Sequence, residues 1–462
     1  MSNNSNGIYD AKTLGVPKML VLGFQHMFAM FGATVLVPLL TGLDMATTLL
    51  MAGLGTLLFH FLTKGKVPAF LGSSFAFLGG YAAVAPAAGA NGMTQAQLLP
   101  YACLGVACAG LVYLVLAGLI KWVGVKKVMK FFPPVVTGPI IIAIGLGLAG
   151  SAVGNCQANW LLAIIALAIV IIFNIWGKGM AKIVPILLGV VGSVVIAAVL
   201  AIIWGETVNV NGADYIALAG NPALLLFNKG SLDAFMAAKW IGFPVKMEGT
   251  IFAIDWSNTA LIISSIIAIV PISLATMMEH IGDISAISST VGKNFIAEPG
   301  LHRTLMGDGL ATSLSAIFGG PANTTYGENT GVLALSKVYD PKVVRIAAVI
   351  AVILSFSPKF AALVDLIPTA IIGGISFVLY GMISAIGVRN VVENKVDFTK
   401  SRNLIVAAII LVSALGLGSV VIPVGSITIS LSALAVASIL GIVLNAILPG
   451  KDYEFNTDIV ED

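Results

Sequence analysis

Charged residues are scarce in this chain. This scarcity distinguishes a membrane protein from a soluble one more clearly than any motif does. Only 10% of the 462 residues are charged, whereas 58% are hydrophobic, and the mean hydropathy is +1.02. Soluble globular domains carry about 25% charged residues. Because lipid accepts apolar surface that water does not, we expect the bilayer to be the solvent of this protein.

Residue types used in metal, redox and hydrolytic chemistry are also few. The chain has four histidines and three cysteines, with no CxxC pair. It contains no Walker motif, no HExxH motif and no recognisable Ser/His/Asp arrangement. Its 24 Lys and Arg residues are scattered over short loops, which argues against nucleic acid as a partner. We therefore predict a protein without cofactor, metal or enzymatic activity.

Long apolar stretches dominate the rest of the sequence. A spanning helix needs about 20 mainly apolar residues. Twelve stretches meet this criterion, at 19–41, 44–63, 96–120, 131–153, 158–177, 183–204, 256–279, 304–319, 343–357, 361–387, 403–420 and 427–448. Two further stretches, 67–86 and 321–336, are interrupted by Pro, Gly and paired hydroxyl residues. Counting these as discontinuous spans predicts fourteen transmembrane segments.

A polar segment at 206–255 divides these predicted spans into two groups of seven. An odd number per half makes the halves insert with opposite orientation, as in inverted-repeat secondary transporters. The breaks echo each other, since Ser73-Ser74-Phe75 in the first corresponds to Thr324-Thr325-Tyr326 in the second. The alternation around the first break resembles a short strand that can pair with the second break. The predicted fold is an all-α polytopic membrane protein of two inverted seven-segment repeats, in which short strands break two segments.

Basic residues predict the orientation. With the N-terminus inside, all but four of the 24 Lys and Arg residues face the cytoplasm, and the exceptions are Lys229, Lys239, Lys246 and Lys359. We therefore expect a multi-pass protein of the cell membrane with both termini cytoplasmic.

Acidic residues within the apolar stretches are candidates for function. A charged side chain at membrane depth costs about 2.5–3.5 kcal/mol on insertion scales, so it usually faces a cavity or a partner. Glu279 and Asp283 are four residues apart and share one face of a helix. The alternative is that both lie in water at the cytoplasmic end of that helix.

The second break is the most polar string at membrane depth. It runs from Asn323 through Tyr326, Gly327 and Glu328 to Asn329. Irregular backbone persists there only where protein or water satisfies it. A half-helix that begins near Gly327 would direct free N–H groups at a bound solute. The alternative is a loop outside the membrane.

The other breaks and spans supply weaker candidates. Phe75 in the first break can offer a ring face to a planar ligand or act as an ordinary core aromatic. Gln25 and His26 in the first span can brace the breaks or form simple hydrogen bonds between helices.

These stretches resemble the nucleobase/ascorbate transporter family, and most closely its bacterial uracil-permease branch. The matching segments are 25–34, 64–77, 279–282, 299–303 and 323–331. The family signature reads Glu328-Asn329-Thr330-Gly331 and, after four residues, Ser336-Lys337, where Ser336 replaces the usual Thr. The resemblance covers residues 15–450.

The resemblance implies roles for individual residues. Glu279 and Glu328 are expected to bind the base, Phe75 to stack on it, and Tyr326 with backbone groups near Ala33 and Gly327 to complete the cavity. Gln25, His26 and Asn329 are expected to support this site. Apart from the resemblance, a carboxylate in a cavity shielded from bulk water is destabilised in its charged form, so we expect Glu279 to carry the coupling proton, with Asp283 as its auxiliary.

The resemblance also implies a division into domains. The expected parts are an N-terminal tail (1–18), a core domain (19–130 and 256–358), a gate domain (131–205 and 359–450), an extracellular loop (206–255) and a C-terminal tail (451–462). Family members commonly form homodimers through the gate domain.

The expected function is proton-coupled import of a nucleobase by alternating access. Glu328 favours uracil, whereas Asp283 stands where uracil permeases tend to have His and purine carriers often have Asp. Xanthine or urate therefore stays open as the substrate. A channel or facilitated-diffusion pore is the alternative of another class, and an intramembrane enzyme is a third.

Overall fold

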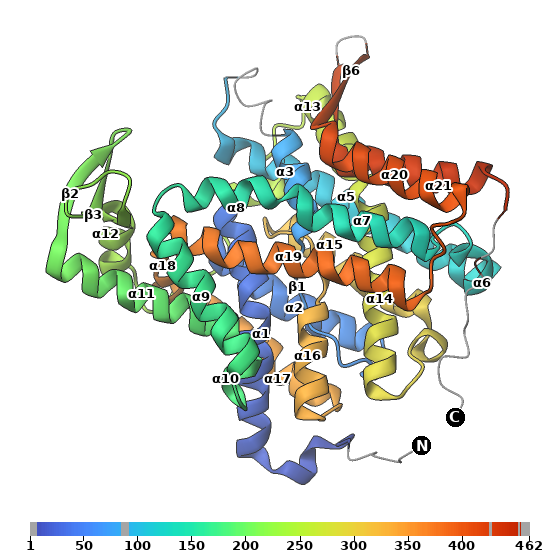
Figure 1. Cartoon of the computed structure of the whole chain (residues 1–462), viewed down its shortest axis with the longest axis horizontal. Coiled ribbons are helices and arrows are strands. Elements are labelled where there is room, and N and C mark those ends of the chain that lie inside the picture. Colours follow the sequence, from blue (N-terminus) through green and yellow to red (C-terminus); the bar gives the residue numbers. More distant parts are fainter. Residues whose placement is uncertain (1–6, 85–91, 425–426, 451–452, 454–462) are drawn as a thin grey trace.

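The structure is a computed structural model that describes residues 7–84, 92–424, 427–450 and 453. Helices make up most of it (Figure 1). The helices before the long polar segment are α1 (Val16–Thr41), α2 (Met45–Leu62), α3 (Leu78–Val84), α5 (Gln95–Val123), α6 (Val125–Met129), α7 (Pro134–Gly147), α8 (Ala149–Cys156), α9 (Trp160–Trp176), α10 (Met180–Ile183) and α11 (Pro185–Trp204). Those within and after it are α12 (Lys229–Ala237), α13 (Thr259–Ile269), α14 (Ile272–Val291), α15 (Leu301–Ile317), α16 (Gly327–Ser336), α17 (Pro341–Ser355), α18 (Pro358–Asp365), α19 (Thr369–Glu393), α20 (Ser401–Gly416) and α21 (Ala433–Ile447).

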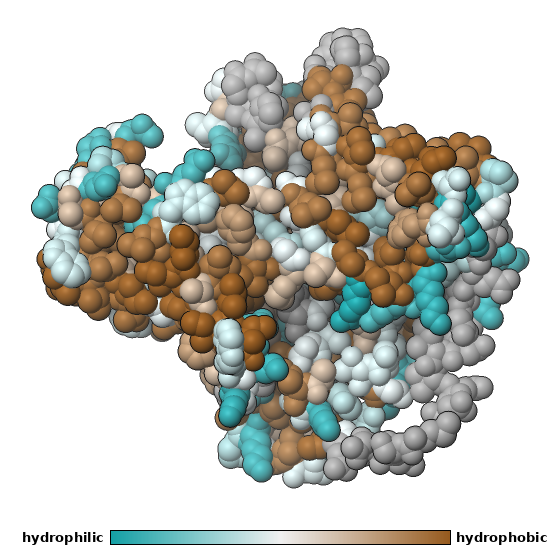
Figure 2. All heavy atoms as spheres, viewed as in Figure 1, coloured by the Kyte–Doolittle hydropathy of each residue, from teal (hydrophilic) through white to brown (hydrophobic). Residues whose placement is uncertain are grey.

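Seven helical segments of the described chain are long and apolar enough to cross a bilayer, or eight if α17 and α18, which are bent by 91°, form one span. Shorter apolar helical segments lie at Phe75–Val84, Trp160–Trp176, Ser401–Gly416 and Ala433–Ile447. These helices and the exposed apolar surface over α9 and α11 (Figure 2) establish the predicted membrane class.

The contacts between helices divide most of them into two groups, which share one continuous buried apolar cluster. In one, α15 packs on α2 and α5, and α17 packs on α1 and α2. In the other, α19 packs on α7, α8 and α9, while α20 packs on α7 and α21 (Figure 1). We call these the α2/α15 group and the α7/α19 group. They meet where α1 contacts α11 and where α14 contacts α7 and α21.

Several predicted segment boundaries were wrong. The stretch predicted to end at residue 279 continues as helix α14 to Val291, because Gly292 adopts a left-handed conformation (φ 69°) and ends it there. The stretch predicted as one segment over 361–387 is divided at Pro368, with α18 before it and α19 after it. Residues 427–432 are not helical but form strand β7, and Ser432 caps α21.

Strands occur in three small sheets. They are β1 (Leu71–Ser73) with β5 (Asn323–Thr325), β2 (Gly205–Val210) with β3 (Ala213–Leu218) and β4 (Leu225–Asn228), and β6 (Ser419–Val424) with β7 (Ile427–Ser432). All pairings are antiparallel. The segment expected only to form an extracellular loop therefore contains a folded sheet and helix α12.

The segment 206–255 contacts both helix groups. The Leu225 N–H donates to the Ala158 carbonyl at 3.0 Å, next to the start of α9. Farther along, the Thr47 hydroxyl of α2 donates to the Pro244 carbonyl at 2.6 Å, and Lys246 pairs with Asp44 at 2.6 Å. The hydrogen bond with Asp44 raises the pKa of Lys246 above its usual value.

The described part of the N-terminal tail packs on the rest of the protein. Ile8 bridges Val338, and the Ala11 N–H donates to the Asp340 carboxylate at 2.8 Å. Asp10 pairs with Lys342 at 3.1 Å, and this interaction lowers the pKa of Asp10. Residues 7–14 are thus held against the loop that precedes α17.

Candidate functional site

The two broken stretches meet in an antiparallel strand pair. In this pair Leu71 lies opposite Thr325, Gly72 opposite Thr324 and Ser73 opposite Asn323. Two more backbone bonds extend the ladder, from the Tyr326 N–H to the Phe70 carbonyl and from the Ser74 N–H to the Ala322 carbonyl, both at 3.0 Å. The pairing suggested by the sequence is therefore present, between segments about 250 residues apart.

Hydroxyl groups of α2 and α15 satisfy the outer backbone groups of these strands. Thr56 of α2 accepts from the Leu71 N–H at 2.9 Å, and Thr312 of α15 donates to the Asn323 carbonyl at 2.7 Å. His60 of α2 places a ring nitrogen 2.9 Å from the Ala69 carbonyl. Non-helical backbone at membrane depth needs such partners, because lipid offers none.

Each strand leads into a helix. The short 3₁₀ turn at Phe75–Phe77 follows β1 and continues as α3, whereas α16 begins at Gly327, two residues after β5. The first N–H groups of a helix have no partner within the helix and carry its positive dipole end. The expected half-helix at Gly327 is thus present, and its N-terminus lies beside the paired strands.

Tyr326 joins both breaks to α1. Its hydroxyl donates to the Ser73 carbonyl at 2.9 Å and lies 3.1 Å from the Thr34 hydroxyl of α1. Its ring covers Gly72 so closely that a Cβ there would stand 2.7 Å from the ring. The sequence placed Tyr326 among the substrate contacts but did not indicate this bracing position.

Phe75 faces the other helix group. Its ring packs edge-on against Tyr380 of α19, with ring centroids 5.4 Å apart and planes at 84°. Phe75 is 6% exposed and Tyr380 is 2% exposed. The sequence analysis did not single out Tyr380, because an aromatic residue within an apolar stretch carries no distinguishing local signal.

Glu279 and Asp283 lie within α14, well before its end at Val291. Both side chains are partly buried. The Thr325 hydroxyl donates to the Asp283 carboxylate at 3.4 Å, and a Cβ on Gly327 would stand 3.2 Å from the same carboxylate. The alternative of two carboxylates at a helix end does not hold, since Asp283 lies beside the N-terminus of α16.

A third carboxylate, which unlike the first two is fully buried, supports the second break. Asp308 of α15 accepts a hydrogen bond from the Thr325 N–H at 2.9 Å and lies 3.4 Å from His280 Nδ1. The same His280 nitrogen is 3.1 Å from the Thr325 hydroxyl. The sequence analysis missed this cluster of Asp308, His280 and Thr325. The signal for it was available, because Asp308 is an acidic residue in an apolar stretch.

His26 of α1 contacts α16. The Asn329 amide donates to the His26 carbonyl at 3.1 Å and lies 3.1 Å from His26 Nδ1. Both side chains are buried, as is the neighbouring Gln25. Of the expected supporting residues, His26 and Asn329 are therefore brought together.

Two predicted site residues are located only by their backbone. Glu328 is the second residue of α16, and Ala33 lies in α1. Their side chains lie outside the part of the chain that the structure describes.

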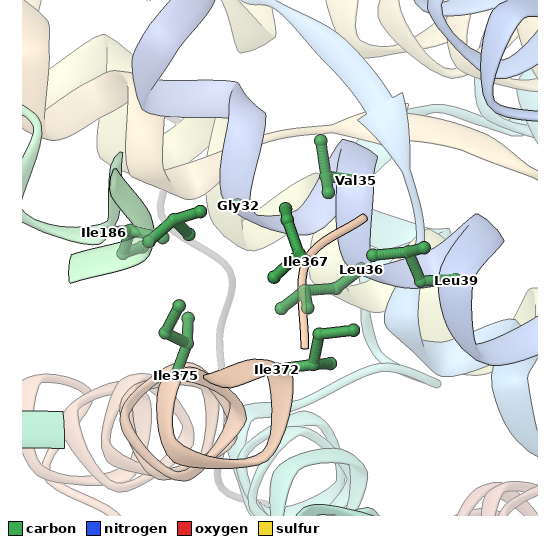
Figure 3. Close-up of a pocket in the computed structure, with 9 residues that line it drawn as sticks. Gly32, Val35, Leu36, Leu39, Ile186, Ile367, Ile372 and Ile375 are labelled. Carbon is green, nitrogen blue, oxygen red and sulfur yellow. The ribbon is translucent and has the colours of Figure 1, made fainter. Parts of the chain in front are cut away.

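Close to Ala33, α1 meets α11 and α19 in an apolar seam (Figure 3). Its cavity is lined by Gly32, Val35, Leu36, Leu39, Ile186, Val190, Ile367, Ile372 and Ile375. The volume of about 10 Å³ is roughly the space of one water molecule. The two helix groups are therefore in close apolar contact along this seam.

The paired breaks bring together complementary chemical groups. Backbone N–H groups at the start of α16 lie near the Asp283 carboxylate of α14, and the Phe75 ring lies at the boundary between the helix groups. Such a set can bind a small polar solute through its donors, its acceptors and an aromatic face.

Comparison with known families decides the class. A sequence model of the Permease family matches residues 17–447. The chain belongs to this family, the nucleobase/ascorbate transporter family. It is a multi-pass membrane transporter and not an enzyme.

Relatives in this family match over nearly their whole length. The uracil permease of Bacillus caldolyticus is 39% identical over 96% of this chain and 94% of its own. The uracil permease of Bacillus subtilis is 38% identical over 92% and 91%. The putative pyrimidine permease RutG of Escherichia coli is 37% identical over 97% and 94%.

Solved transporters share the fold at low sequence identity. The transmembrane domain of the cyanobacterial bicarbonate transporter BicA gives a TM-score of 0.63 at 15% identity, covering 94% of this chain and 99% of that domain. SLC26A9 gives 0.63 at 13% identity, covering 95% of this chain and 66% of its own. These likenesses place the permease in a known transporter fold.

Proposed function

We propose that this permease imports a nucleobase by proton symport, with uracil as the leading candidate substrate. The pairing of the two breaks beside α14 carries the proposal, because it gathers carboxylates, helix N-termini and an aromatic ring in one place. The uracil permeases among its relatives support the choice of a nucleobase.

The chemistry of uracil fits these groups. Uracil offers two ring N–H donors and two carbonyl acceptors around a flat ring. In the proposed complex, Glu279 and Glu328 accept the ring N–H groups, and backbone groups near Gly327 and Ala33 contact the carbonyls. Phe75 covers one face of the ring.

A purine such as xanthine or urate is the second candidate substrate. It presents the same kinds of donors and acceptors on a larger ring system, and Asp283 is the feature that favours it. Glu328 favours uracil, and we give it more weight because it is proposed to touch the base directly.

Glu279 is the proposed proton carrier, with Asp283 as its auxiliary. A carboxyl group shielded from bulk water can take up a proton outside and release it inside. When protonated, Glu279 can donate to a base carbonyl, so that proton and base strengthen each other's binding. The contacts of Asp283 beside the start of α16, four residues after Glu279 on the same helix, support this auxiliary role.

The proposed architecture is fourteen spans in two inverted repeats of seven. The eight longer spans, the four shorter apolar segments, α15 and α16 together support this number. The equivalent positions of Thr56 and Thr312 against the two strands support the repeat. In this scheme the α2/α15 group is the core domain, the α7/α19 group is the gate domain, and they move relative to each other in alternating access.

The basic residues support cytoplasmic termini. We also propose a homodimer through the gate domain, because members of the family commonly form one. The exposed apolar face of this group is compatible with both lipid and a second copy (Figure 2).

Uptake into liposomes tests the transport proposal. Purified protein is reconstituted without sodium, and radiolabelled uracil or xanthine is supplied under an inward proton gradient. We expect uracil to accumulate, and accumulation to collapse with a protonophore. Uptake that ignores the pH gradient would indicate facilitated diffusion or a channel, and a requirement for sodium would indicate another coupling ion.

Two glutamine variants separate the roles of the glutamates. Glu328→Gln removes an acceptor without removing volume, so uracil uptake should fall strongly at unchanged protein abundance. Glu279→Gln should still exchange base across the membrane but lose accumulation. Unchanged uracil uptake by Glu328→Gln would remove this residue from the site.

A further inference from the structure

An apolar groove lies on the side of the protein opposite α9 and α11. Its volume is about 460 Å³, within the range of roughly 300–1,000 Å³ that small-ligand sites occupy. The walls include Leu119 and Val123 of α5, Leu274 of α14, and Ile439 and Val443 of α21. The groove therefore runs between helices of both groups.

One end of this groove is basic. Lys127 of α6 is the charged residue among its lining residues. Lys121, Lys126 and Lys130 are exposed on the same short stretch of chain. Helices α5, α6, α7 and α21 contain no Asp or Glu. Among the described residues, none of these four lysines forms an ion pair with a carboxylate.

The aromatic and polar residues at this end mark a membrane surface. Trp122 is 85% exposed beside Lys121, and Trp and Lys are typical of the bilayer interface. The Asn445 amide of α21 donates to the Lys130 carbonyl at 3.1 Å, and Arg402 binds the Asn445 side chain at 2.6 Å. The groove thus begins at a cationic surface and continues along apolar walls into the membrane.

We propose that this groove binds an anionic phospholipid. An acyl chain lies along the walls formed by α5, α14 and α21, and the headgroup phosphate lies at Lys127. Basic sites between transmembrane helices are suited to anionic headgroups at the cytoplasmic surface. A free phosphate compound would leave the apolar walls uncovered, so the bilayer is the source of the ligand.

The position of the groove connects lipid binding to transport. Leu274 precedes Glu279 by five residues on α14, while Ile439 and Val443 belong to the other helix group. A lipid held there contacts two elements that change their relative position in alternating access. Bound lipid therefore alters the rate of uptake as well as the stability of the protein.

Lipid binding is tested on purified, delipidated protein without any transport assay. Native mass spectrometry measures retention of dioleoylphosphatidylglycerol and of the matched phosphatidylcholine. We expect the wild-type protein to prefer phosphatidylglycerol. Lys127→Gln should weaken that binding about five-fold, the effect expected for one lysine at an anionic surface. The control Lys178→Gln changes an exposed lysine between α9 and α10, far from the groove, and should bind as wild type does.

A second variant tests the apolar part of the groove. Val443→Trp fills the groove from α21 and should reduce retention of both lipids, with thermal unfolding used to verify that the variant is folded. Equal retention of the two lipids by wild type would overturn the proposal, as would equal binding by Lys127→Gln and wild type. If Val443→Trp does not fold, the comparison of Lys127→Gln with Lys178→Gln alone tests the proposal.

Discussion

Phe75 lies where the two helix groups meet. It follows strand β1 in the chain, and its ring contacts Tyr380 of α19. The two ring planes are nearly perpendicular, an arrangement that aromatic pairs prefer over face-to-face stacking. Its low exposure here is consistent with the closed apolar seam along α1.

The Phe75 ring should contribute to substrate binding. We expect Phe75→Ala to weaken uracil binding by about 1–3 kcal/mol, the usual effect of removing an aromatic ring that stacks on a base. Phe75→Tyr and Phe75→Trp should retain more affinity, as measured by isothermal titration calorimetry. Phe61→Ala is the control, since Phe61 is 80% exposed at the end of α2. Equal losses in all three Phe75 variants would instead indicate a packing role.

Asp308 of α15 binds the backbone of the second break at Thr325 and is fully buried. Its carboxylate accepts from the Thr325 N–H and faces His280, so removing it leaves a buried backbone donor unsatisfied. A buried donor without a partner costs about 1–3 kcal/mol.

The two substitutions Asp308→Asn and Asp308→Leu should therefore differ. Asn keeps an oxygen that can accept from Thr325, whereas Leu keeps only volume. We expect the melting temperature to fall in the order wild type, Asn, Leu. A Leu variant as stable as wild type would show that the Asp308 contacts do not hold the break in place.

At the scale of elements, the strand pair is the feature around which the site is built. Thr56 and Thr312 satisfy its outer backbone groups, and Tyr326 covers its surface. This leaves little room at Gly72, where a side chain would meet the Tyr326 ring and the Thr34 hydroxyl.

Gly72→Ala should therefore separate the strands or displace Tyr326. Overpacking of this kind typically costs about 1–3 kcal/mol, and we expect a lower melting temperature together with a strong loss of uracil uptake. Gly118→Ala is the control, because the position of its Cβ on α5 has no atom within 4 Å. If both variants transport normally, the strand pair tolerates more movement than its geometry indicates.

At the scale of the whole molecule, the segment 206–255 spans both helix groups. Its sheet is held at Ala158 near α9, whereas Pro244 and Lys246 are held by α2. If the two helix groups move relative to each other, this segment must bend or some of these contacts must break. The same segment contains three of the four basic residues assigned to the outside.

Cysteine labelling in intact cells tests this orientation. In a background without native cysteines, Lys239→Cys should react with a membrane-impermeant maleimide, because residue 239 is exposed and its segment is assigned to the outside by the basic residues. Lys178→Cys between α9 and α10 should react only after permeabilisation. Labelling of residue 178 in intact cells would contradict the assignment of that turn to the cytoplasm.

Much of the architecture can be predicted from the sequence, because hydropathy is a local property. Apolar length locates most of the helices, and Pro, Gly and hydroxyl residues locate both breaks. Boundaries fail where hydropathy and conformation do not change at the same residue. Strands β6 and β7 lie in a largely apolar part of the sequence, whereas α14 stays helical through the polar residues that follow 279.

The sequence by itself determined that this protein lies in a lipid bilayer. It also located the two interrupted segments and the acidic residues whose burial in lipid would be costly. Only the tertiary structure decided which groups satisfy one another. Tyr326 binds Ser73 across 253 positions, and Asn329 binds His26 across 303. Such partners depend on how helices far apart in the chain are placed side by side, and no local pattern encodes that distance. For the same reason the partners of Asp308, the contact of Phe75 with Tyr380 and the groove at Lys127 became visible only once the helices were packed.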